Sequence, residues 1–208
     1  MIACNPIFIR IYSCRSPSIG IYLKQGYSMD QVKTIKAKNG EVIILRPGEC
    51  DDSCGILDTI RSTALERSYI LMDHYGKKIE SEKQYISGLD RSKNLFMVAV
   101  AGDNVVGCLA ALQADAGQLE STAHILHVGL HLRESNRGLG IGSEMLAYAE
   151  AWALERGFKK LEASIFTGNK RSLHLFNRAG FAEEGVRKIR VRVDNNYLDE
   201  VLVGKILS

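Results

Sequence analysis

The chain has 208 residues, of which 46% are hydrophobic and 25% charged, a composition that predicts one globular domain with a sizeable core. A formal net charge of +3 is too small to indicate a nucleic-acid partner, and no apolar run approaches the roughly 18 residues of a membrane span, so we expect neither partner. Five cysteines at irregular spacings favour reduced thiols, and we expect a cytoplasmic protein.

Residues 1–38 are expected to form an N-terminal extension, followed by a single domain at residues 39–208. Pro6, Pro17 and serine-rich turns leave the extension without a clear periodic pattern, and Met29 is an internal methionine that we expect to be the physiological start. The competing interpretation is that residues 7–12 and 19–23 form strands that extend a sheet or bridge a homodimer.

The first part of the domain is predicted to contain two helices between β-strands. A short β-rich strand at 41–45 leads to a helix at 52–68 and a second helix at 77–89, and a hairpin follows with strands at 95–100 and 102–112. Cys50 and Cys54 have a spacing that could suggest a metal site. They lack a second pair or nearby histidines, so the pattern favours a helix-start turn, and no metal is expected.

The second part alternates strands and helices. It is predicted to contain a strand at 123–132, a helix at 143–156 that stops at Gly157, a strand at 160–166, a helix at 169–179 and a final hairpin with strands at 186–193 and 200–207. The apolar residues of the helix at 143–156 fall on one face, which indicates core packing. These are Met145, Leu146, Ala149, Trp152 and Ala153.

A glycine-rich turn, Arg137-Gly-Leu-Gly-Ile-Gly142, joins the strand at 123–132 to the helix at 143–156. Glycines at alternate positions let backbone amides approach a ligand, and the start of a helix attracts an anion. Arg137 would add a fixed positive charge at the mouth of the site. The turn therefore predicts a phosphate-binding site, with a β–α connection that binds nothing as the alternative.

Two nucleotide-binding motifs also contain a glycine-rich turn before a helix. A P-loop requires a lysine followed by Ser or Thr after its glycines, and no lysine follows Gly140 or Gly142, so a P-loop is excluded. A dinucleotide-binding fingerprint requires a third glycine where Ser143 stands, and it normally follows the first strand of a domain. The dinucleotide interpretation is therefore weak.

The turn resembles motif A of the GNAT N-acetyltransferases, Arg/Gln-x-x-Gly-x-Gly/Ala, and two later segments resemble further parts of that family. The segment from Asn169 to Phe181 is similar to Asn-x-x-Ala-x-x-x-Tyr-x-x-x-Gly-Phe, and Glu184-Gly185 with Asn195-Asn-Tyr-Leu-Asp199 resembles the close of the branch that acetylates amino acids and antibiotics. The resemblance covers residues 40–208. It implies an α/β (α+β) GNAT fold of order β-α-α-β-β-β-α-β-α-β-β, with a mixed, mostly antiparallel sheet whose fourth and fifth strands splay around acetyl-CoA.

The resemblance also implies an activity, transfer of an acetyl group from acetyl-CoA to a primary amine by direct attack. A small-molecule amine is favoured as acceptor over a protein N-terminus. Main-chain groups at Leu130 and Leu132 would pair with the pantetheine arm, and Asn169 would contact the arm or the thioester. The pyrophosphate would be bound by the amides of Arg137, Gly138, Leu139, Gly140, Ile141, Gly142 and Ser143.

The catalytic base is expected among three histidines on or beside the strand at 123–132. Strand alternation places His127 and His131 on one face and His124 on the other, so the three do not all face the acceptor. His127 is favoured, since related enzymes often carry a carboxylate at its place, with His124 second and His131 third. The alternative is that all three are structural or face solvent.

Phe176 stands where the family has a tyrosine that protonates the leaving thiolate. A phenyl ring donates no proton, so the sequence predicts a slower or water-assisted step. It also leaves open an alternative function, an acetyl-CoA-binding sensor with little turnover. The loop at 66–75 is expected to line the acceptor pocket, where Glu66 and Asp73 could hold an ammonium group and Arg67 a carboxylate.

Overall fold

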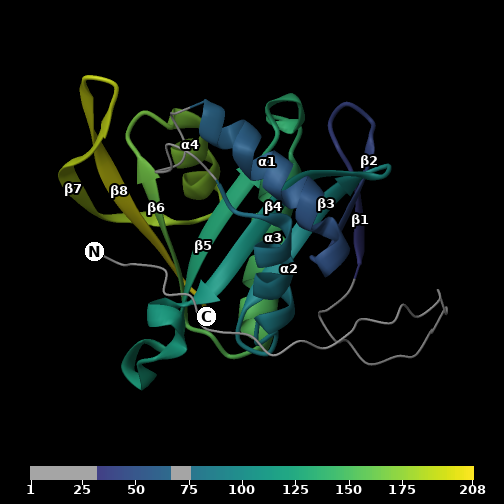
Figure 1. Cartoon of the computed structure of the whole chain (residues 1–208). Helices are drawn as coiled ribbons and strands as arrows, with labels where there is room; N and C mark the ends of the chain where they lie inside the picture. Colours follow the sequence, from purple (N-terminus) through teal and green to yellow (C-terminus); the bar gives the residue numbers. More distant parts are fainter. Residues whose placement is uncertain (1–31, 67–75) are drawn as a thin grey trace.

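The computed structural model describes residues 32–66 and 76–208, which form one eight-stranded sheet flanked by helices (Figure 1). The strands expected at 7–12 and 19–23, and the acceptor-loop residues Arg67 and Asp73, lie outside the described residues. The strand order in the sheet is β1-β2-β3-β4-β5-β6-β8-β7, and every neighbouring pair is antiparallel except β5 and β6.

The strands are β1 (Lys33–Lys36), β2 (Val42–Pro47), β3 (Leu95–Ala101), β4 (Asn104–Gln113), β5 (Ile125–Leu132), β6 (Lys160–Phe166), β7 (Ala182–Val193) and β8 (Asn196–Ile206). The α-helices are α1 (Ser53–Leu65), α2 (Ile79–Gly88), α3 (Ile141–Glu155) and α4 (Lys170–Arg178). Short 3-10 turns lie at Cys50–Asp52, Ala114–Gly117, Glu120–Thr122 and Glu134–Asn136.

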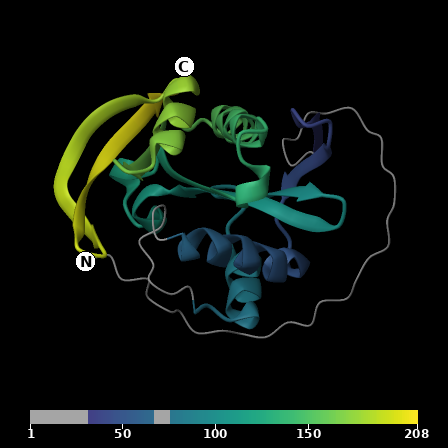
Figure 2. The ribbon, with the colours of Figure 1, turned by 90° about the horizontal axis from the view of Figure 1, so that it is seen from above.

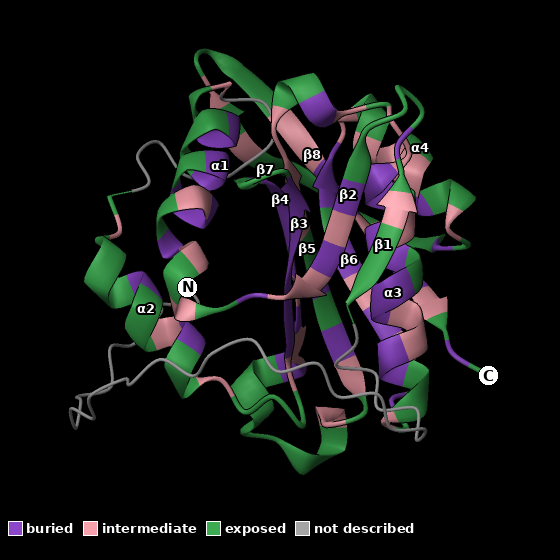
Figure 3. Cartoon of the chain, turned by 90° about the vertical axis from the view of Figure 1, so that its right-hand side faces the viewer, coloured by how far each residue is buried: buried purple, intermediate pink, exposed green. Residues whose placement is uncertain are grey.

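The helices cover the two faces of the sheet, with α1 and α2 on one side and α3 and α4 on the other (Figure 2). Alternation along the strands builds a separate hydrophobic core against each layer. On β4, Leu109 belongs to the core that contains α3, whereas Cys108 belongs to the core that contains residues of α1 and α2. The centre of the sheet is therefore buried from both sides (Figure 3).

Helix α3 contributes the central part of the larger core. The five apolar residues predicted to pack from this helix are all at most 2% exposed, and Trp152 stacks on Phe158 with ring centroids 5.9 Å apart. The segment around Cys50 and Cys54 forms a 3-10 turn that runs into α1, as the sequence predicted, and the three described cysteines are free thiols. Within the described residues, no helix is long and apolar enough to cross a membrane.

The predicted GNAT fold is confirmed, with one additional strand. β1 pairs with β2 through four residue pairs, from Lys33 with Leu45 to Lys36 with Val42. The four β1 residues fall in the predicted N-terminal extension. This strand carries no periodic pattern in the sequence, because three of the four β1 residues are exposed and only Ile35 packs against the core. Several boundaries also differ from the prediction. β5 begins at Ile125, so His124 precedes the strand, and α3 begins at Ile141 instead of residue 143. The last two strands begin four residues earlier than expected, at Ala182 and Asn196, and α1 ends at Leu65 instead of residue 68.

Candidate functional site

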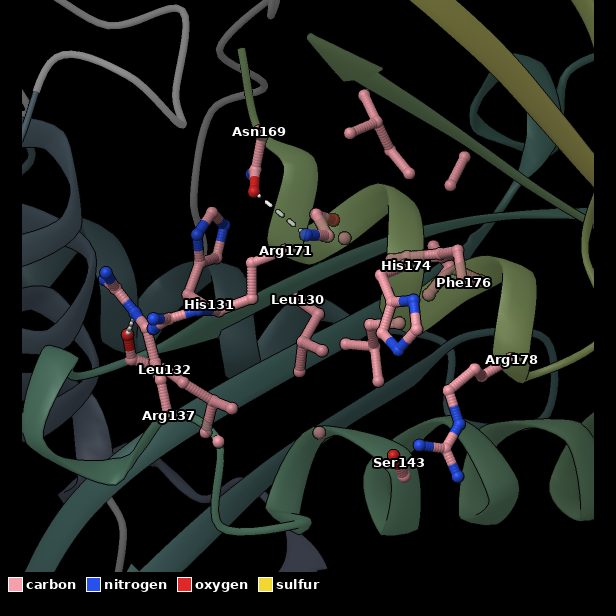
Figure 4. A pocket seen from close by; sticks show the side chains of 18 of the residues that line it. Leu130, His131, Leu132, Arg137, Ser143, Asn169, Arg171, His174, Phe176 and Arg178 are labelled. Atoms are coloured by element: carbon pink, nitrogen blue, oxygen red, sulfur yellow. Dashed lines mark hydrogen bonds between the residues drawn. The ribbon is translucent and has the colours of Figure 1, made fainter. Parts of the chain in front are cut away.

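A cavity of about 410 Å³ opens where β5 and β6 separate (Figure 4). These two strands pair in parallel at only three positions, the last being His127 with Glu162. Beyond that point β5 pairs only with β4 and β6 only with β8. The lining includes β5 residues from Val128 to Leu132 and β6 residues from Ala163 to Phe166, so the cavity fills the gap between the diverging strands.

The free edge of β5 presents backbone groups to this gap. The amide of Arg133 donates to the carbonyl of Val106 on the β4 side, at 2.9 Å. Because successive peptide groups of a strand point to opposite sides, those of Leu130 and Leu132 face the gap. The Leu132 carbonyl accepts from Nε of Arg137 at 2.9 Å, which leaves the Leu132 N–H and both polar groups of Leu130 as an edge for an extended ligand.

The glycine-rich turn borders the same cavity and ends at the start of α3. Gly140 is the N-cap of α3, with φ of 90°, a left-handed conformation that favours glycine. The amides of Arg137 and Ser143 are used, since they donate to Glu134 and Gly140 carbonyls at 3.2 and 3.1 Å. The amides from Gly138 to Gly142 donate to no carbonyl among the described residues, so they remain available to an anion at the positive end of the helix.

The members of the turn lie differently around the cavity. Gly138, Gly140, Gly142 and Ser143 line it, whereas Ile141 is 1% exposed and packs in the core, and Leu139 packs against that core. A Cβ at Gly142 would lie 3.1 Å from a methyl group of Leu175, so this glycine also permits close packing between α3 and α4. The side chains of Leu139 and Ile141 are thus structural, so these two residues can contribute to ligand binding only through their backbone amides.

Arg137 is not the free cation at the mouth that the sequence suggested. Its guanidinium forms a two-pronged ion pair with Glu66 at the end of α1, with Nη1 2.6 Å from Oε2, and its Nε binds the Leu132 carbonyl. The arginine side chain is 10% exposed. Arg137 therefore joins α1 to the end of β5, and Glu66, expected to hold an ammonium group of the acceptor, carries a charge that this arginine balances.

Helix α4 supplies two arginines and a histidine that the sequence analysis missed. Arg171, His174 and Arg178 are exposed and line the cavity opposite the glycine turn (Figure 4). Their spacing of three and four residues puts them on one helical face, which is the signal that could have found them. Asn169 also lines the cavity, and its Oδ1 caps α4 by accepting from the Ser172 amide at 3.0 Å.

Phe176 lines the cavity with a side chain that is 3% exposed and packs edge-on against Phe181, with ring centroids 4.9 Å apart. Its ring donates no hydrogen bond. Hydroxyl groups on the lining come from Thr63, Ser143, Ser164 and Ser172.

The three histidines occupy different surroundings. His131 lines the cavity, and burial, followed by the charge of Arg137, lowers its pKa from 6.5 to about 4. His127 is absent from the lining; its side chain is 57% exposed on the same face of β5, and Nδ1 lies 3.6 Å from Oε2 of Glu162. His124 is exposed, precedes β5 and is also absent from the lining.

The charged side chains on the lining are all cations: Lys38, Arg137, Arg171 and Arg178. No carboxylate from the described ranges lines the cavity, so the site suits an anionic ligand such as a phosphate ester. Among residues 32–66 and 76–208, no group of three or more His, Cys, Asp or Glu side chains could hold a metal ion.

Comparisons with known proteins show which family and fold this chain is similar to. Residues 62–181 match the model of the Acetyltransferase (GNAT) family. A Bacillus subtilis (strain 168) protein named "Putative phosphinothricin acetyltransferase YwnH" is 31% identical over 131 residues, which cover 62% of this chain and 78% of that protein.

Solved structures share the fold. A ribosomal-protein-alanine N-acetyltransferase from Brucella melitensis is 26% identical with a TM-score of 0.70, covering 78% of this chain and 99% of that one. The acetyltransferase yncA from Salmonella typhimurium, solved with its cofactor acetyl-CoA, is 15% identical with a TM-score of 0.73, covering 80% of this chain and 94% of that one. The last likeness concerns the fold alone.

Proposed function

The chain belongs to the acetyltransferase (GNAT) family, and we propose that this acetyl-CoA-dependent N-acetyltransferase acts on the primary amine of a small molecule. The observation that carries the proposal is the gap between β5 and β6, which ends at the unpaired amides of the glycine turn. An extended arm with a phosphate end fits this shape. Acetyl-CoA would supply an acetyl group already activated as a thioester.

The residues that would hold acetyl-CoA follow from this geometry. The amides from Gly138 to Gly142 would receive the pyrophosphate, and the edge of β5 at Leu130 and Leu132 would pair with the pantetheine arm. The capping role of Asn169 orients the start of α4 beside the same arm. The cavity contains no carboxylate from the described residues to repel the phosphates.

We assign the role of base to His127. It lies at the last β5–β6 pair, where the strands begin to part, and on the sheet face opposite α3. Oε2 of Glu162 lies 3.6 Å from Nδ1, slightly longer than a hydrogen bond. A small rotation of the exposed ring would let this carboxylate accept from Nδ1 and would leave Nε2 to take a proton from the acceptor, directly or through water. His131 is a poorer base, because its pKa of about 4 lies far below the pH at which the amine must be deprotonated.

Single substitutions separate the three histidines. We expect His127→Gln to lower kcat/KM about 10²-fold without changing the affinity for CoA, because general base catalysis contributes at least that factor. Glu162→Gln should cause a smaller loss, since the ring would keep its proton-accepting atom. A loss of kcat/KM that occurs only in His124→Gln or only in His131→Gln would assign the role of base to that histidine.

The choice of a small-molecule acceptor is supported by the name of the Bacillus subtilis relative, which contains phosphinothricin. The competing acceptor is a protein N-terminus, as in the name of the Brucella melitensis structure. CoA release should be measured with a panel of small amines and with peptides that carry a free N-terminus. Turnover with small amines is the expected result, and activity restricted to peptides would contradict the proposal.

A further inference from the structure

We propose that Lys38, at the turn between β1 and β2, is a phosphate-binding residue that contacts the pyrophosphate of acetyl-CoA. The inference rests on the proposed function and deepens it. It starts from the pairing of Arg137 with Glu66: the arginine of the glycine motif is engaged, so the cation that faces the glycine turn must come from elsewhere. Apart from Arg137, Lys38 is the lining cation that lies against this turn.

The β1–β2 turn is fixed against the glycine turn. The amide of Lys38 donates to the carbonyl of Leu139 at 3.0 Å, and Ala37 is buried in the core that contains α3. The ion pair of Lys33 with Glu144, 2.8 Å between Nζ and Oε2, ties β1 to the first turn of α3. The backbone position of Lys38 is therefore set by contacts on both sides, although its side chain is exposed.

The side chain of Lys38 reaches Gly140 in the turn. Its Cε lies 4.0 Å from the position that a Cβ would take on Gly140, and Nζ is one bond further. Lys38 has no ion-pair partner in the described part of the chain, so its charge is available. A lysine beside unpaired amides at a helix start is a strong combination for a phosphate, since the ammonium and the amides act on the same oxygens.

The position of Lys38 indicates which phosphate it contacts. The amides from Gly138 to Gly142 are the natural place for the pyrophosphate, and Lys38 lies beside them. Two other cations on the lining, Arg171 and Arg178, have no ion-pair partner within the described ranges and come from α4 on the opposite wall. Arg178 points across the cavity toward Ser143 in the first turn of α3 (Figure 4). We therefore assign Lys38 to the pyrophosphate of CoA and not to its 3′-phosphate.

Two measurements test this assignment. One is calorimetric titration with CoA and with dephospho-CoA, and the other is a kinetic assay with acetylpantetheine. We expect Lys38→Gln to weaken the Kd about tenfold for both CoA and dephospho-CoA, as the loss of one charged hydrogen bond predicts. The kcat/KM with acetylpantetheine, which lacks the pyrophosphate, should stay unchanged. Lys38→Arg should recover most of the affinity, and Lys36→Gln, which removes an exposed lysine of β1 away from the lining, serves as the charge-matched control.

Each result bears on the assignment separately. Wild-type affinity in Lys38→Gln would overturn it, and so would an equal loss in Lys36→Gln, which would show a general charge effect. A loss for CoA that disappears with dephospho-CoA would assign Lys38 to the 3′-phosphate, and a loss of activity with acetylpantetheine would show a structural role. Failure of the wild-type protein to bind CoA would instead overturn the proposed function.

Discussion

Phe176 lines the cavity with a ring that has no proton to donate, at the position where the sequence resemblance to the family implies a tyrosine. We expect Phe176→Tyr to keep or raise kcat, because a positioned acid contributes up to about 10²–10⁴ in rate when protonation of the leaving sulfur limits turnover. CoA release at saturating substrate measures this. Phe181→Tyr adds the same hydroxyl to the neighbouring ring outside the lining and is the control. A fall in kcat at unchanged Tm would show that another donor already acts.

His131 gives the folded protein a dependence on pH. Its pKa is lowered to about 4 by burial and by the charge of Arg137, against 6.5 for the free side chain. Above pH 6.5 both the folded and unfolded chains hold the neutral ring. Between pH 6.5 and pH 4 the histidine ring is protonated in the unfolded chain but stays neutral in the folded protein. The free energy of unfolding therefore falls as the pH falls.

The corresponding prediction compares Tm values over this range. From pH 7 to pH 4.5, the wild-type Tm should fall a few degrees more than that of His131→Gln, which lacks the titrating ring. His124→Gln, which removes an exposed histidine, should follow the wild type. Parallel pH profiles for the wild type and His131→Gln would contradict the lowered pKa.

Only some of the site residues and their interactions could be predicted from the sequence. The glycine spacing at residues 138–142 predicted the unpaired amides, because that property depends on local backbone alone. The pairing of Arg137 with Glu66 joins residues 71 positions apart, and no local pattern encodes it. The same holds for Lys38, whose place at the cavity depends on how the β1–β2 turn packs against the glycine turn.

At the scale of elements, the glycine at the start of α3 allows a sharp experiment. Gly140 and Gly157 flank this helix with φ of 90° and 78°, so a valine at either site should cost about 1–3 kcal/mol in backbone strain. Only Gly140 lines the cavity. We expect Gly140→Val to lose CoA binding, and Gly157→Val to lose a similar amount of stability while keeping it.

Denaturant unfolding and calorimetric titration with CoA would measure the two effects on the same pair of proteins. Equal CoA affinity in folded Gly140→Val and Gly157→Val would contradict a role of this turn in phosphate binding. Loss of CoA affinity in both variants would show that stability, and not the position of the substitution, decides the result.

Periodicity predicted the regular elements well, because each of them buries one face. Helix α3 shows an apolar stripe, and β3 and β4 are apolar runs in the sheet centre, where β3 is buried along its whole length. β1 was missed for the opposite reason. A short, exposed edge strand with one packed residue carries no periodic signal, and its pairing with β2 depends on the tertiary structure.

At the scale of the whole molecule, the cavity is lined by residues from parts of the chain that lie far apart in the sequence. The diverging ends of β5 and β6 shape it, α4 brings cations to one wall, and the β1–β2 turn brings Lys38 to the other. The family match begins at residue 62, so β1 and its turn lie before the matched region. We therefore expect the chain before the matched region to consist of a dispensable part and a part required for CoA binding, with the division between Met29 and Lys33.

Two shortened proteins locate this division. A chain that begins at Met29 should keep the wild-type Tm, oligomeric state and CoA affinity, because β1 begins at Lys33. A chain that begins at Gly40 should lose stability, since it removes β1 from β2 and the buried side chain of Ala37, and it should bind CoA more weakly because it lacks Lys38.

The competing expectation, strands at 7–12 and 19–23 that bridge a homodimer, predicts that the Met29 chain already changes its oligomeric state. Size-exclusion chromatography with light scattering separates the two: a shift from dimer to monomer on removal of residues 1–28 would assign those residues to an interface, and an unchanged state with a loss only in the Gly40 chain would assign the structural role to β1 and its turn.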